Sequence, residues 1–239
     1  MNRLQEKLNE AYERHYSSTR GPELHVDKYT HKKFQRQYGH LVDSLPMGSE
    51  IMDVGCGTGI LLSWLSRKPR LKLRGIDTSP SCIQLAQELL GSRAEVQGAN
   101  AVELTSWQPR FRGIFCMDMI EHVEKDSDLW DILRGIQRAL LPNGFFVIKT
   151  PNMANLFAAY SRYFDATHHR GFTRTSLTQI LEAAGFTKIE FMKRRSVGIR
   201  QWLGLRLEHV SHWLLYRLSG RDLKERFEKY LYVICYKEG

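Results

Sequence analysis

Apolar side chains in the first 45 residues recur at intervals of three and four positions, the spacing that lines one face of a helix. They are Leu4, Leu8, Tyr12, Phe34, Tyr38, Leu41 and Leu45. Pro46-Met47-Gly48 follows, and such residue types end helices. We therefore expect polar N-terminal helices over residues 1–45.

The pattern changes at Glu50, where short apolar runs begin to alternate with helical stretches. Strands alternating with helices are typical of βαβ units and a parallel sheet. The apolar runs predict strands at 51–54, 71–77, 94–97, 113–117 and 145–149. The helical stretches predict helices at 59–67, from 79 onward and at 127–140, and Pro142-Asn143-Gly144 is expected to end the last one.

The chain closes with a predicted helix over 173–185 and two predicted strands, at 188–193 and 230–236. Two antiparallel strands can be joined by about two to five residues. More than thirty residues separate these two. Residues 196–228 are therefore an insert, and we expect helices in it.

One helical stripe runs through the insert, formed by Leu203, Leu207, Val210 and Leu214 at i, i+4, i+7 and i+11. Aromatic and arginine residues widen and flank this stripe: Trp202, Trp213, Tyr216, Arg200, Arg206 and Arg217. Such an amphipathic helix could pack on the body as a lid over an acceptor site, or cover the sheet edge. It could also lie in the interface of an anionic membrane and collect a lipid-linked acceptor.

Length and composition indicate one globular domain, because the chain has 239 residues of which 42% are hydrophobic. We interpret 1–239 as a single domain with a core of 46–195 and 229–239. No apolar run approaches the ~20 residues that cross a bilayer, and the first residues lack the apolar stretch of a secretory signal. The four scattered cysteines show no C-x-x-C pair, so we expect reduced thiols and a cytoplasmic location.

The net charge of +9 indicates an acidic partner, such as a nucleic acid, an anionic lipid surface or a phosphorylated substrate. Between Lys193 and Lys229 there are ten basic and four acidic residues, which gives this segment a charge of +6. These basic residues alternate with leucines and tryptophans at helical spacing, and no RNA-binding module is recognisable. A nucleic acid is therefore not the favoured partner.

A glycine-rich turn, residues 55–59, lies between a predicted strand and a predicted helix. Glycine lets the backbone turn sharply and approach a ligand, and the helix start beyond it offers unpaired N–H groups. Asp77 lies twenty residues after Gly57, at the end of the next strand, where it can accept hydrogen bonds from both hydroxyls of a ribose. The third glycine is Gly59 and not residue 60, which favours a nucleoside without a pyrophosphate over a dinucleotide.

The run Asp53-Val54-Gly55-Cys56-Gly57-Thr58-Gly59-Ile60, with Gly75-Ile76-Asp77-Thr78-Ser79, resembles the class I S-adenosylmethionine-dependent methyltransferases. Residues 115–123 resemble the fourth-strand motif of the ubiquinone-biosynthesis-like branch of that family. Residues 141–152 and 165–173 are similar to the same branch. The likeness covers roughly residues 29–195 and the last strand, and its later motifs do not specify a substrate.

The resemblance implies a Rossmann-like α/β fold with seven strands, six parallel and the last antiparallel, and helices on both faces. It implies S-adenosyl-L-methionine as cofactor and S-adenosyl-L-homocysteine as product. Asp53 would orient the turn and lie near the methionine amino group, and Asp77 would hold the ribose. The turn that wraps the methionine and ribose would be Gly55, Cys56, Gly57, Thr58 and Gly59.

Adenine would lie against Thr78 and the stretch that contains Ala99, Asn100 and Ala101. Many relatives carry an aspartate at the position of Asn100, and asparagine still offers a carbonyl acceptor to the adenine amino group. Met117 and Asp118, at the end of the fourth strand, would line the methionine side of the cofactor.

Methyl transfer removes the positive charge of a sulfonium, so positioning and desolvation can supply much of the catalysis. An oxygen nucleophile usually still needs a base, and the candidates are His122, His168 and His169. His122 follows the fourth strand, and the other two follow a helix that is expected to begin near Asn152.

Two other roles stay open for these residues. Glu121-His122 could instead hold the loop before the helix at Ser127. The histidines, Glu121 and Asp165 could also form a metal site, but their spacing is not diagnostic and we assign no metal.

These observations predict an S-adenosylmethionine-dependent methyltransferase whose acceptor is a small molecule, a glycan or a lipid-linked molecule, with oxygen as the favoured atom. An RNA methyltransferase and a non-catalytic S-adenosylmethionine-binding protein are the alternatives. The expected location is cytoplasmic, and residues 196–228 could provide peripheral contact with a membrane.

Overall fold

The computed structural model describes Lys7, Ala11 and residues 27–220 and 227–239. The predicted helical positions Leu4, Leu8 and Tyr12 lie outside the described residues. Helix α2 (Lys28–Val42) begins at Asp27, whose carboxylate accepts a 2.6 Å hydrogen bond from the main-chain N–H of Thr30. This N-cap satisfies one of the donors that a helix start leaves unpaired.

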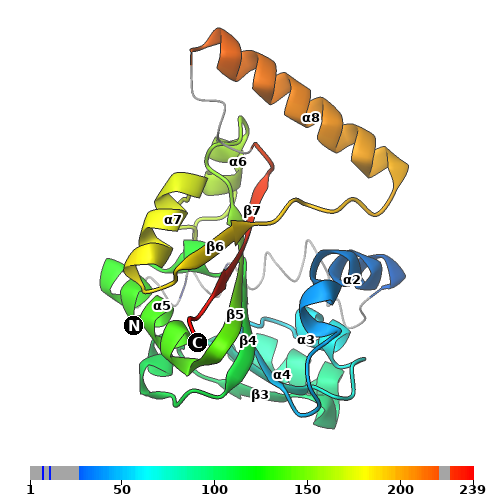
Figure 1. Cartoon of the computed structure of the whole chain (residues 1–239), viewed down its shortest axis with the longest axis vertical. Coiled ribbons are helices and arrows are strands. Elements are labelled where there is room, and N and C mark those ends of the chain that lie inside the picture. Colours follow the sequence, from blue (N-terminus) through cyan, green and yellow to red (C-terminus); the bar gives the residue numbers. More distant parts are fainter. Residues whose placement is uncertain (1–6, 8–10, 12–26, 221–226) are drawn as a thin grey trace.

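Within the described residues, seven strands form one sheet in the order β3-β2-β1-β4-β5-β7-β6 (Figure 1). The pairs from β3 to β5 are parallel, whereas β7 runs antiparallel to both β5 and β6. The predicted Rossmann-like fold class, with its antiparallel last strand, is therefore confirmed. The strands are β1 (Glu50–Val54), β2 (Lys72–Asp77), β3 (Glu95–Gly98), β4 (Phe111–Met117), β5 (Leu140–Pro151), β6 (Lys188–Phe191) and β7 (Tyr230–Tyr236).

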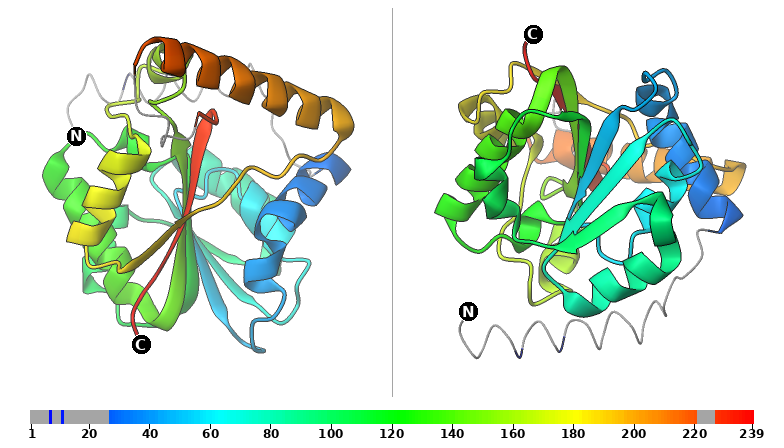
Figure 2. Two further views of the ribbon diagram at one scale, coloured as in Figure 1. Left: turned by 45° about the horizontal axis from the view of Figure 1, so that its top comes forward. Right: turned by 90° about the horizontal axis from the view of Figure 1, so that it is seen from below.

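Helices cover both faces of the sheet, as Figures 1 and 2 show. Helices α2, α3 and α4 lie on one face with Phe115 of β4, and α5 and α7 lie on the other with Ile114. Neighbouring strand residues point to opposite faces, so a strand that is buried on both sides is a continuous apolar run. The remaining helices are α3 (Ile60–Leu65), α4 (Pro80–Leu90), α5 (Asp126–Ala139), α6 (Ala158–Tyr163), α7 (Arg174–Ala183) and α8 (Ile199–Leu218), with short 3₁₀ helices at Gly91–Arg93, Ala101–Ser106 and Ile120–His122.

The prediction that Pro142-Asn143-Gly144 ends a helix is wrong. Helix α5 already ends at Ala139, and the three residues lie inside β5. They form an irregularity there, because the partners of β5 change register between Phe111 and Gly113 of β4. Asn143 has a left-handed φ of 59°, which a turn tolerates and a regular strand does not.

The helix expected from Asn152 begins only at Ala158. The side chain of Asn152 accepts a hydrogen bond from Ala154 N at 3.0 Å, and that of Asn155 accepts one from Phe157 N at 2.8 Å. These side chains take the donors that a helix would use and hold the segment in turns.

Helix α8 occupies most of the predicted insert. It lies beyond the carboxyl end of the parallel strands, where β4 ends and β7 begins (Figure 2). Its apolar stripe points away from the protein, since Leu203, Leu207 and Val210 are 50%, 72% and 59% exposed. Any interpretation in which this stripe packs on the body, as a lid or over the sheet edge, is therefore wrong. The opposite face of the helix is the one that contacts the protein.

No helix among the residues that the structure describes is both long enough and apolar enough to cross a bilayer. All four cysteines lie in described segments, and none forms a disulfide.

Candidate functional site

The glycine-rich turn connects β1 to α3 at the carboxyl end of the sheet. Gly55, Gly57 and Gly59 all have left-handed φ values, of 73°, 50° and 80°. The N–H groups of Gly55 and Cys56 both donate to the carbonyl of Ile76 in β2, at 2.9 and 3.0 Å. The turn is thereby fastened to the neighbouring strand, and residues with a Cβ would be strained at its three glycines.

The space around the three glycines differs. A Cβ on Gly55 would lie 2.6 Å from Cγ of Met119, and one on Gly59 would lie 3.1 Å from Cβ of Ala86 in α4. A Cβ on Gly57 would meet no described atom within 4 Å. Packing thus excludes a Cβ at Gly55 and leaves little room for one at Gly59, whereas Gly57 leaves its backbone accessible to a ligand.

Asp77, at the end of β2, is joined directly to this turn. Its Oδ2 accepts a hydrogen bond from Gly57 N at 2.8 Å, and its Oδ1 accepts one from Ser79 N at 2.9 Å. Each carboxylate oxygen has a second lone pair. The carboxylate can therefore hold the turn and still accept hydrogen bonds from two ligand hydroxyls.

Asp53 is a buried acid, and one of its carboxyl oxygens lacks a hydrogen bond. The side chain is 2% exposed, and its Oδ1 has no hydrogen-bond partner among the described residues. Burial and the nearby negative charge of Asp77 raise the pKa of Asp53 to about 8. A cationic ligand group at this oxygen would satisfy both its missing hydrogen bond and its charge.

The other predicted residues of the turn contribute in different ways. Cys56 points its side chain at β2, because a Cβ on Gly75 would lie 2.9 Å from its Sγ, and burial raises the pKa of its thiol. Only the main chain of Cys56 faces the candidate site. Thr58 is half-buried and Thr78 is exposed.

The predicted adenine stretch follows β3. Ala99 N donates to the carbonyl of Asp77 at 3.0 Å, which places this stretch next to the end of β2. Asn100 caps the 3₁₀ helix that begins at Ala101, and its Oδ1 accepts a hydrogen bond from Val102 N at 3.1 Å. The same side chain also accepts from the main-chain N–H of Glu103 in a capping box, so its oxygen is engaged by the start of the 3₁₀ helix.

Met117 is the last residue of β4, and Asp118 follows it at the same end of the sheet as the glycine turn. Asp118 has a φ of 53°, an uncommon conformation for a residue with a side chain, and one that clusters at functional sites. Its carboxylate forms an ion pair with Lys149 of β5. Burial opposes the charge of Lys149, but the field of Asp118 prevails and raises the pKa of the lysine. The hydroxyl of Tyr38, from α2, approaches Sδ of Met117 at 4.0 Å.

The side chains of two of the three candidate histidines are in contact. The rings of His122 and His168 pack edge to face with centroids 4.7 Å apart. Ligand atoms of Glu121, His122 and His168 all lie within 4.8 Å of one another, an arrangement that could hold a metal ion. His169 is not in this group; its main-chain N–H donates to the carbonyl of Glu121 at 2.8 Å.

Hydrogen bonding determines the tautomers of both histidines. The hydroxyl of Thr167 donates to Oδ1 of Asp165 at 2.7 Å, so its oxygen accepts the 2.8 Å bond from Nδ1–H of His122. Nδ1 of His168 lies 2.9 Å from the carbonyl of Ser161, which can only accept. In both rings the lone pair is therefore on Nε2.

The surroundings of His122 and Glu121 favour the neutral form of each side chain. Burial and the neighbouring charge of His168 lower the pKa of His122 to about 4. Burial and the charge of Asp118 raise the pKa of Glu121 to about 8. Its Oε2 accepts a 3.0 Å hydrogen bond from the hydroxyl of Thr150, and its Oε1 has no partner among the described residues.

Residues 121–126 are held by the loop after α6. Arg170 donates to the carbonyl of Val123 at 2.6 Å and to the carboxylate of Asp126 at 2.7 Å. Arg170 thus holds this loop, and a contribution from the Glu121 and His122 side chains stays a prediction. Those side chains point to Thr150 and Thr167.

Comparison with known proteins identifies the family. A family model described as "Methyltransferase domain" matches residues 26–190, which is more than half of the chain. The chain belongs to this methyltransferase family. The resemblance to the class I S-adenosylmethionine-dependent enzymes is thereby confirmed.

Relatives of this methyltransferase include a ubiquinone biosynthesis O-methyltransferase of Azorhizobium caulinodans, 33% identical over 122 residues, 49% of this chain and 47% of the relative. The chain spans less than half the length of the curated relatives it matches first. An S-adenosylmethionine-dependent methyltransferase of Archaeoglobus fulgidus has a similar structure, with a TM-score of 0.66 and 20% identity over 95% of this chain and 99% of the other. A phosphoethanolamine N-methyltransferase of Haemonchus contortus, in complex with S-adenosyl-L-methionine, has a TM-score of 0.61 and 15% identity over 94% of this chain and 59% of the other.

Several residues at the site of this methyltransferase are absent from the sequence prediction. Lys149, Thr150 and Thr167 touch the predicted residues directly. Thr167 immediately precedes His168, so the motif itself indicated it. Lys149 and Thr150 reach the site only because β5 pairs with β4, which a local pattern does not reveal.

A hollow of about 370 Å³ lies at the opposite end of this sheet, where β1, β2 and β3 begin. Four of its charged residues form ion pairs: Arg110 with Glu50 at 2.7 Å, and Arg74 with Glu95 at 2.6 Å. The hollow is remote from the glycine turn and is not part of the site.

Proposed function

We propose that the chain is an S-adenosylmethionine-dependent methyltransferase that methylates an oxygen atom of a small-molecule acceptor. The observation that carries the proposal is the glycine turn, with its accessible backbone at Gly57 held by the carboxylate of Asp77. In this proposal residues 1–239 work as one catalytic unit, and 196–228 are an accessory part of it.

The residues present fit this cofactor. The unpaired Oδ1 of Asp53 would accept from the methionine ammonium, and the free lone pairs of Asp77 would accept from the ribose hydroxyls. Adenine would lie between Thr78 and residues 99–101, and Met117 and Asp118 would line the methionine side. These assignments place the cofactor at the carboxyl ends of the strands, where open α/β sheets bind their ligands.

His122 is the general base in this proposal. Bound S-adenosylmethionine would supply an electrophilic methyl group; the acceptor oxygen bonds to that carbon as the carbon–sulfur bond breaks. The acceptor proton passes to Nε2 of His122, while Thr167 and Asp165 hold the ring through Nδ1. With a pKa of about 4 the ring is neutral near pH 7, so it is unprotonated when the acceptor binds.

His168 has the second role at this site. Its ring packs on His122, and its Nε2 carries a lone pair, so it can hold the acceptor hydroxyl or a bound cation. Glu121, whose pKa is raised to about 8, is mostly neutral near pH 7 and adds little negative charge to this site. The main chain of His169 fastens the loop, and its side chain is the least favoured of the three candidates.

The favoured acceptor is carried by a lipid or a glycan. Support comes from the arginines and tryptophans of residues 196–228, which suit an anionic or amphipathic carrier. The relatives named for ubiquinone biosynthesis also support a hydroxylated small molecule. The proposed location is the cytoplasm, with residues 196–228 at a membrane surface.

One experiment tests this function. The purified chain is incubated with methyl-labelled S-adenosylmethionine and cell extract, with and without membranes, and the extract is separated into RNA, protein and solvent-extractable fractions. Label in the solvent-extractable fraction that hot hydriodic acid releases as methyl iodide, as it does from methyl ethers and esters, supports the proposal. Label in RNA would establish the RNA methyltransferase, and binding without any transfer would establish a non-catalytic binding protein.

A further inference from the structure

Helix α8 is turned so that Glu208 and His212 meet the protein, while most of its large apolar side chains and its three arginines are exposed. The buried face carries His212, which is fully buried, with Glu208 and Tyr216 one turn to either side. The exposed face carries most of the large apolar residues of the helix: Ile199, Trp202, Leu203, Leu207, Val210, Trp213, Leu214, Leu215 and Leu218. A surface of this size on one element is an interaction site, because water solvates it poorly.

Specific contacts hold the helix in this orientation. His212 Nε2 accepts a 2.9 Å hydrogen bond from Leu156 N, and its Nδ1 donates to the carbonyl of Glu208 at 2.7 Å. The carboxylate of Glu208 accepts from Asn155 at 2.9 Å, and the hydroxyl of Tyr216 donates to the carbonyl of Ala154 at 2.7 Å. Residues 154–156, between β5 and α6, therefore hydrogen-bond to one side of α8, and the apolar stripe on its other side faces outward.

The charges of the helix indicate what covers the exposed face. Its single acidic residue, Glu208, is turned toward the protein. Its three arginines are exposed, and Arg206 and Arg217 lie over the rings of Trp202 and Trp213 at 5.1 and 5.6 Å. The exposed face is thus apolar and cationic, without a carboxylate.

This charge pattern disfavours a second copy of the chain. A two-fold dimer through this face would bring arginines together with no acid to pair with them. An anionic bilayer offers what the face lacks: phosphates for the arginines, a headgroup layer for the indole rings, and hydrocarbon for the leucines. We propose that α8 docks the protein on an anionic phospholipid bilayer, with its axis in the plane of the interface.

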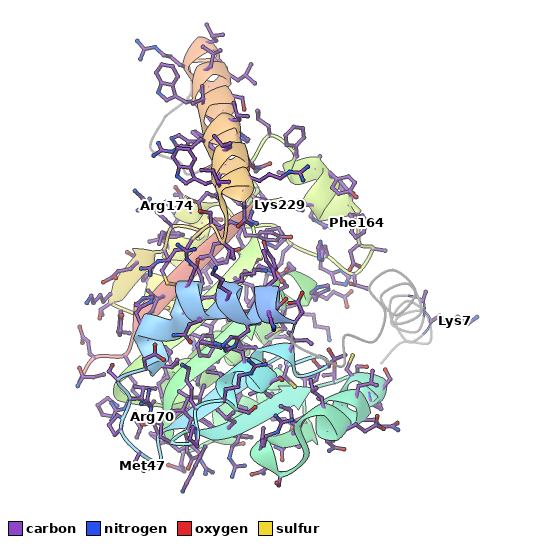
Figure 3. All side chains as sticks on the ribbon, turned by 90° about the vertical axis from the view of Figure 1, so that its right-hand side faces the viewer. Lys7, Met47, Arg70, Phe164, Arg174 and Lys229 are labelled. Atoms are coloured by element: carbon purple, nitrogen blue, oxygen red, sulfur yellow. The ribbon has the colours of Figure 1, made fainter. Side chains whose placement is uncertain are left out.

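The docking would bring the candidate site to the membrane. Figure 3 shows α8 projecting beyond the sheet, with Phe164, at the end of α6, also turned outward. Helix α6 also carries exposed aromatic residues, and the ring of Tyr160 packs on that of Phe164 with centroids 5.4 Å apart. The carbonyl of Ser161 in α6 binds His168, so the docked surface and the histidine cluster share one short segment.

Vesicle binding tests the proposal without any need for methyl transfer. The full chain is sedimented with neutral phosphatidylcholine vesicles and with vesicles that contain 30–40% phosphatidylglycerol, roughly the anionic content needed for such surface attraction. We expect binding to the anionic vesicles only, weakened by salt. Fluorescence of Trp202 and Trp213 should shift to the blue on binding, and Trp202→Phe/Trp213→Phe should bind without this shift.

Matched variants locate the contact. Leu207→Asp/Val210→Asp should abolish vesicle binding. The control is Met47→Asp, which also places an aspartate at an exposed apolar position. Met47 is 85% exposed on the loop before β1, and its substitution should leave binding unchanged. Arg206→Gln/Arg217→Gln should weaken binding roughly 30-fold, at about 1 kcal/mol for each arginine, and Lys72→Gln/Arg134→Gln should not.

Two results would overturn the proposal. One is equal or absent binding to both kinds of vesicle. The other is a dimer in analytical ultracentrifugation that Leu207→Asp/Val210→Asp dissociates, because the face would then be an interface between copies. If the aspartate pair fails to fold, the arginine pair and the tryptophan shift still decide the question.

Discussion

Oδ2 of Asp77 accepts a 2.8 Å hydrogen bond from the main-chain N–H of Gly57, across the gap between the first two strands of the Rossmann-like sheet. This one contact joins the acid at the end of β2 to Gly57, where an added Cβ would meet no described atom within 4 Å. The carboxylate therefore shapes the turn and, in the proposed complex, also holds the ribose. A variant at Asp77 should affect both functions.

Asp77→Asn should weaken the binding of S-adenosylhomocysteine at least tenfold, which is about 1.4 kcal/mol. The amide has one acceptor oxygen in place of two, so it cannot serve Gly57 N, Ser79 N and two hydroxyls together. Calorimetry measures the affinity, and Glu95→Gln, at the exposed side of β3, is the control for loss of a negative charge. Unchanged affinity in Asp77→Asn would contradict the assignment of the ribose.

Gly57→Ala should abolish or greatly weaken cofactor binding while the protein stays folded. Its Cβ meets no described atom within 4 Å, so the cost to folding is the left-handed φ alone, roughly 1–2 kcal/mol. Gly48→Ala is the matched control, because Gly48 has a φ of 80° and equally open surroundings on the loop before β1. Both variants should lose similar thermal stability, and only Gly57→Ala should lose affinity. Equal affinity in the two would place the cofactor elsewhere.

His122→Ala should reduce turnover about a hundredfold or more, the usual contribution of a general base, with little change in cofactor affinity. Thr167→Val should reduce turnover less, because it removes the hydrogen bond that orients the ring, and Thr167→Ser should restore it. His169→Ala should be close to wild type, since its side chain lies outside the cluster. Normal turnover after substitution of each of the three histidines would rule out a histidine base.

Cofactor binding should release a proton at pH 7. The pKa of Asp53 is about 8 in the free protein, so the group is mostly protonated at this pH. An ammonium beside its carboxylate would favour the charged form and lower the pKa. Calorimetry in buffers of different ionisation enthalpy measures the release, which Asp53→Asn should eliminate. Proton uptake, or a release that persists in Asp53→Asn, would contradict the placement of the methionine ammonium.

The same residue should make the stability of the free protein depend on pH. The pKa of Asp53 in the folded state lies above its ordinary value of 3.8, so the folded state binds a proton that the unfolded state releases. Stability from this group is complete below about pH 4 and is lost as pH rises toward 8. Asp53→Asn should flatten the decline of the melting temperature between pH 5 and 8. An unaltered decline would assign it to another group.

Local pattern was sufficient for most of the sheet and for the glycine turn. Parallel strands buried on both faces are continuous apolar runs, and the left-handed φ of Gly55, Gly57 and Gly59 favours glycine in the turn itself. The irregular start of β5 was missed because Pro142-Asn143-Gly144 has the same turn chemistry inside a bulged strand as after a helix. The contact between His122 and Thr167 joins residues 45 positions apart, so no local pattern contains it.

Helix α8 shows which of its properties follow from its own residues and which depend on its contacts in the folded protein. The periodicity of Leu203, Leu207, Val210 and Leu214 determined that a helix with one apolar face forms, since side chains at those spacings share a face in any helix. Which face meets the protein depended on Asn155 and the main chain of residues 154–156, more than fifty positions away. Periodicity describes one element, but the orientation of that element is determined by the partners that folding brings to it.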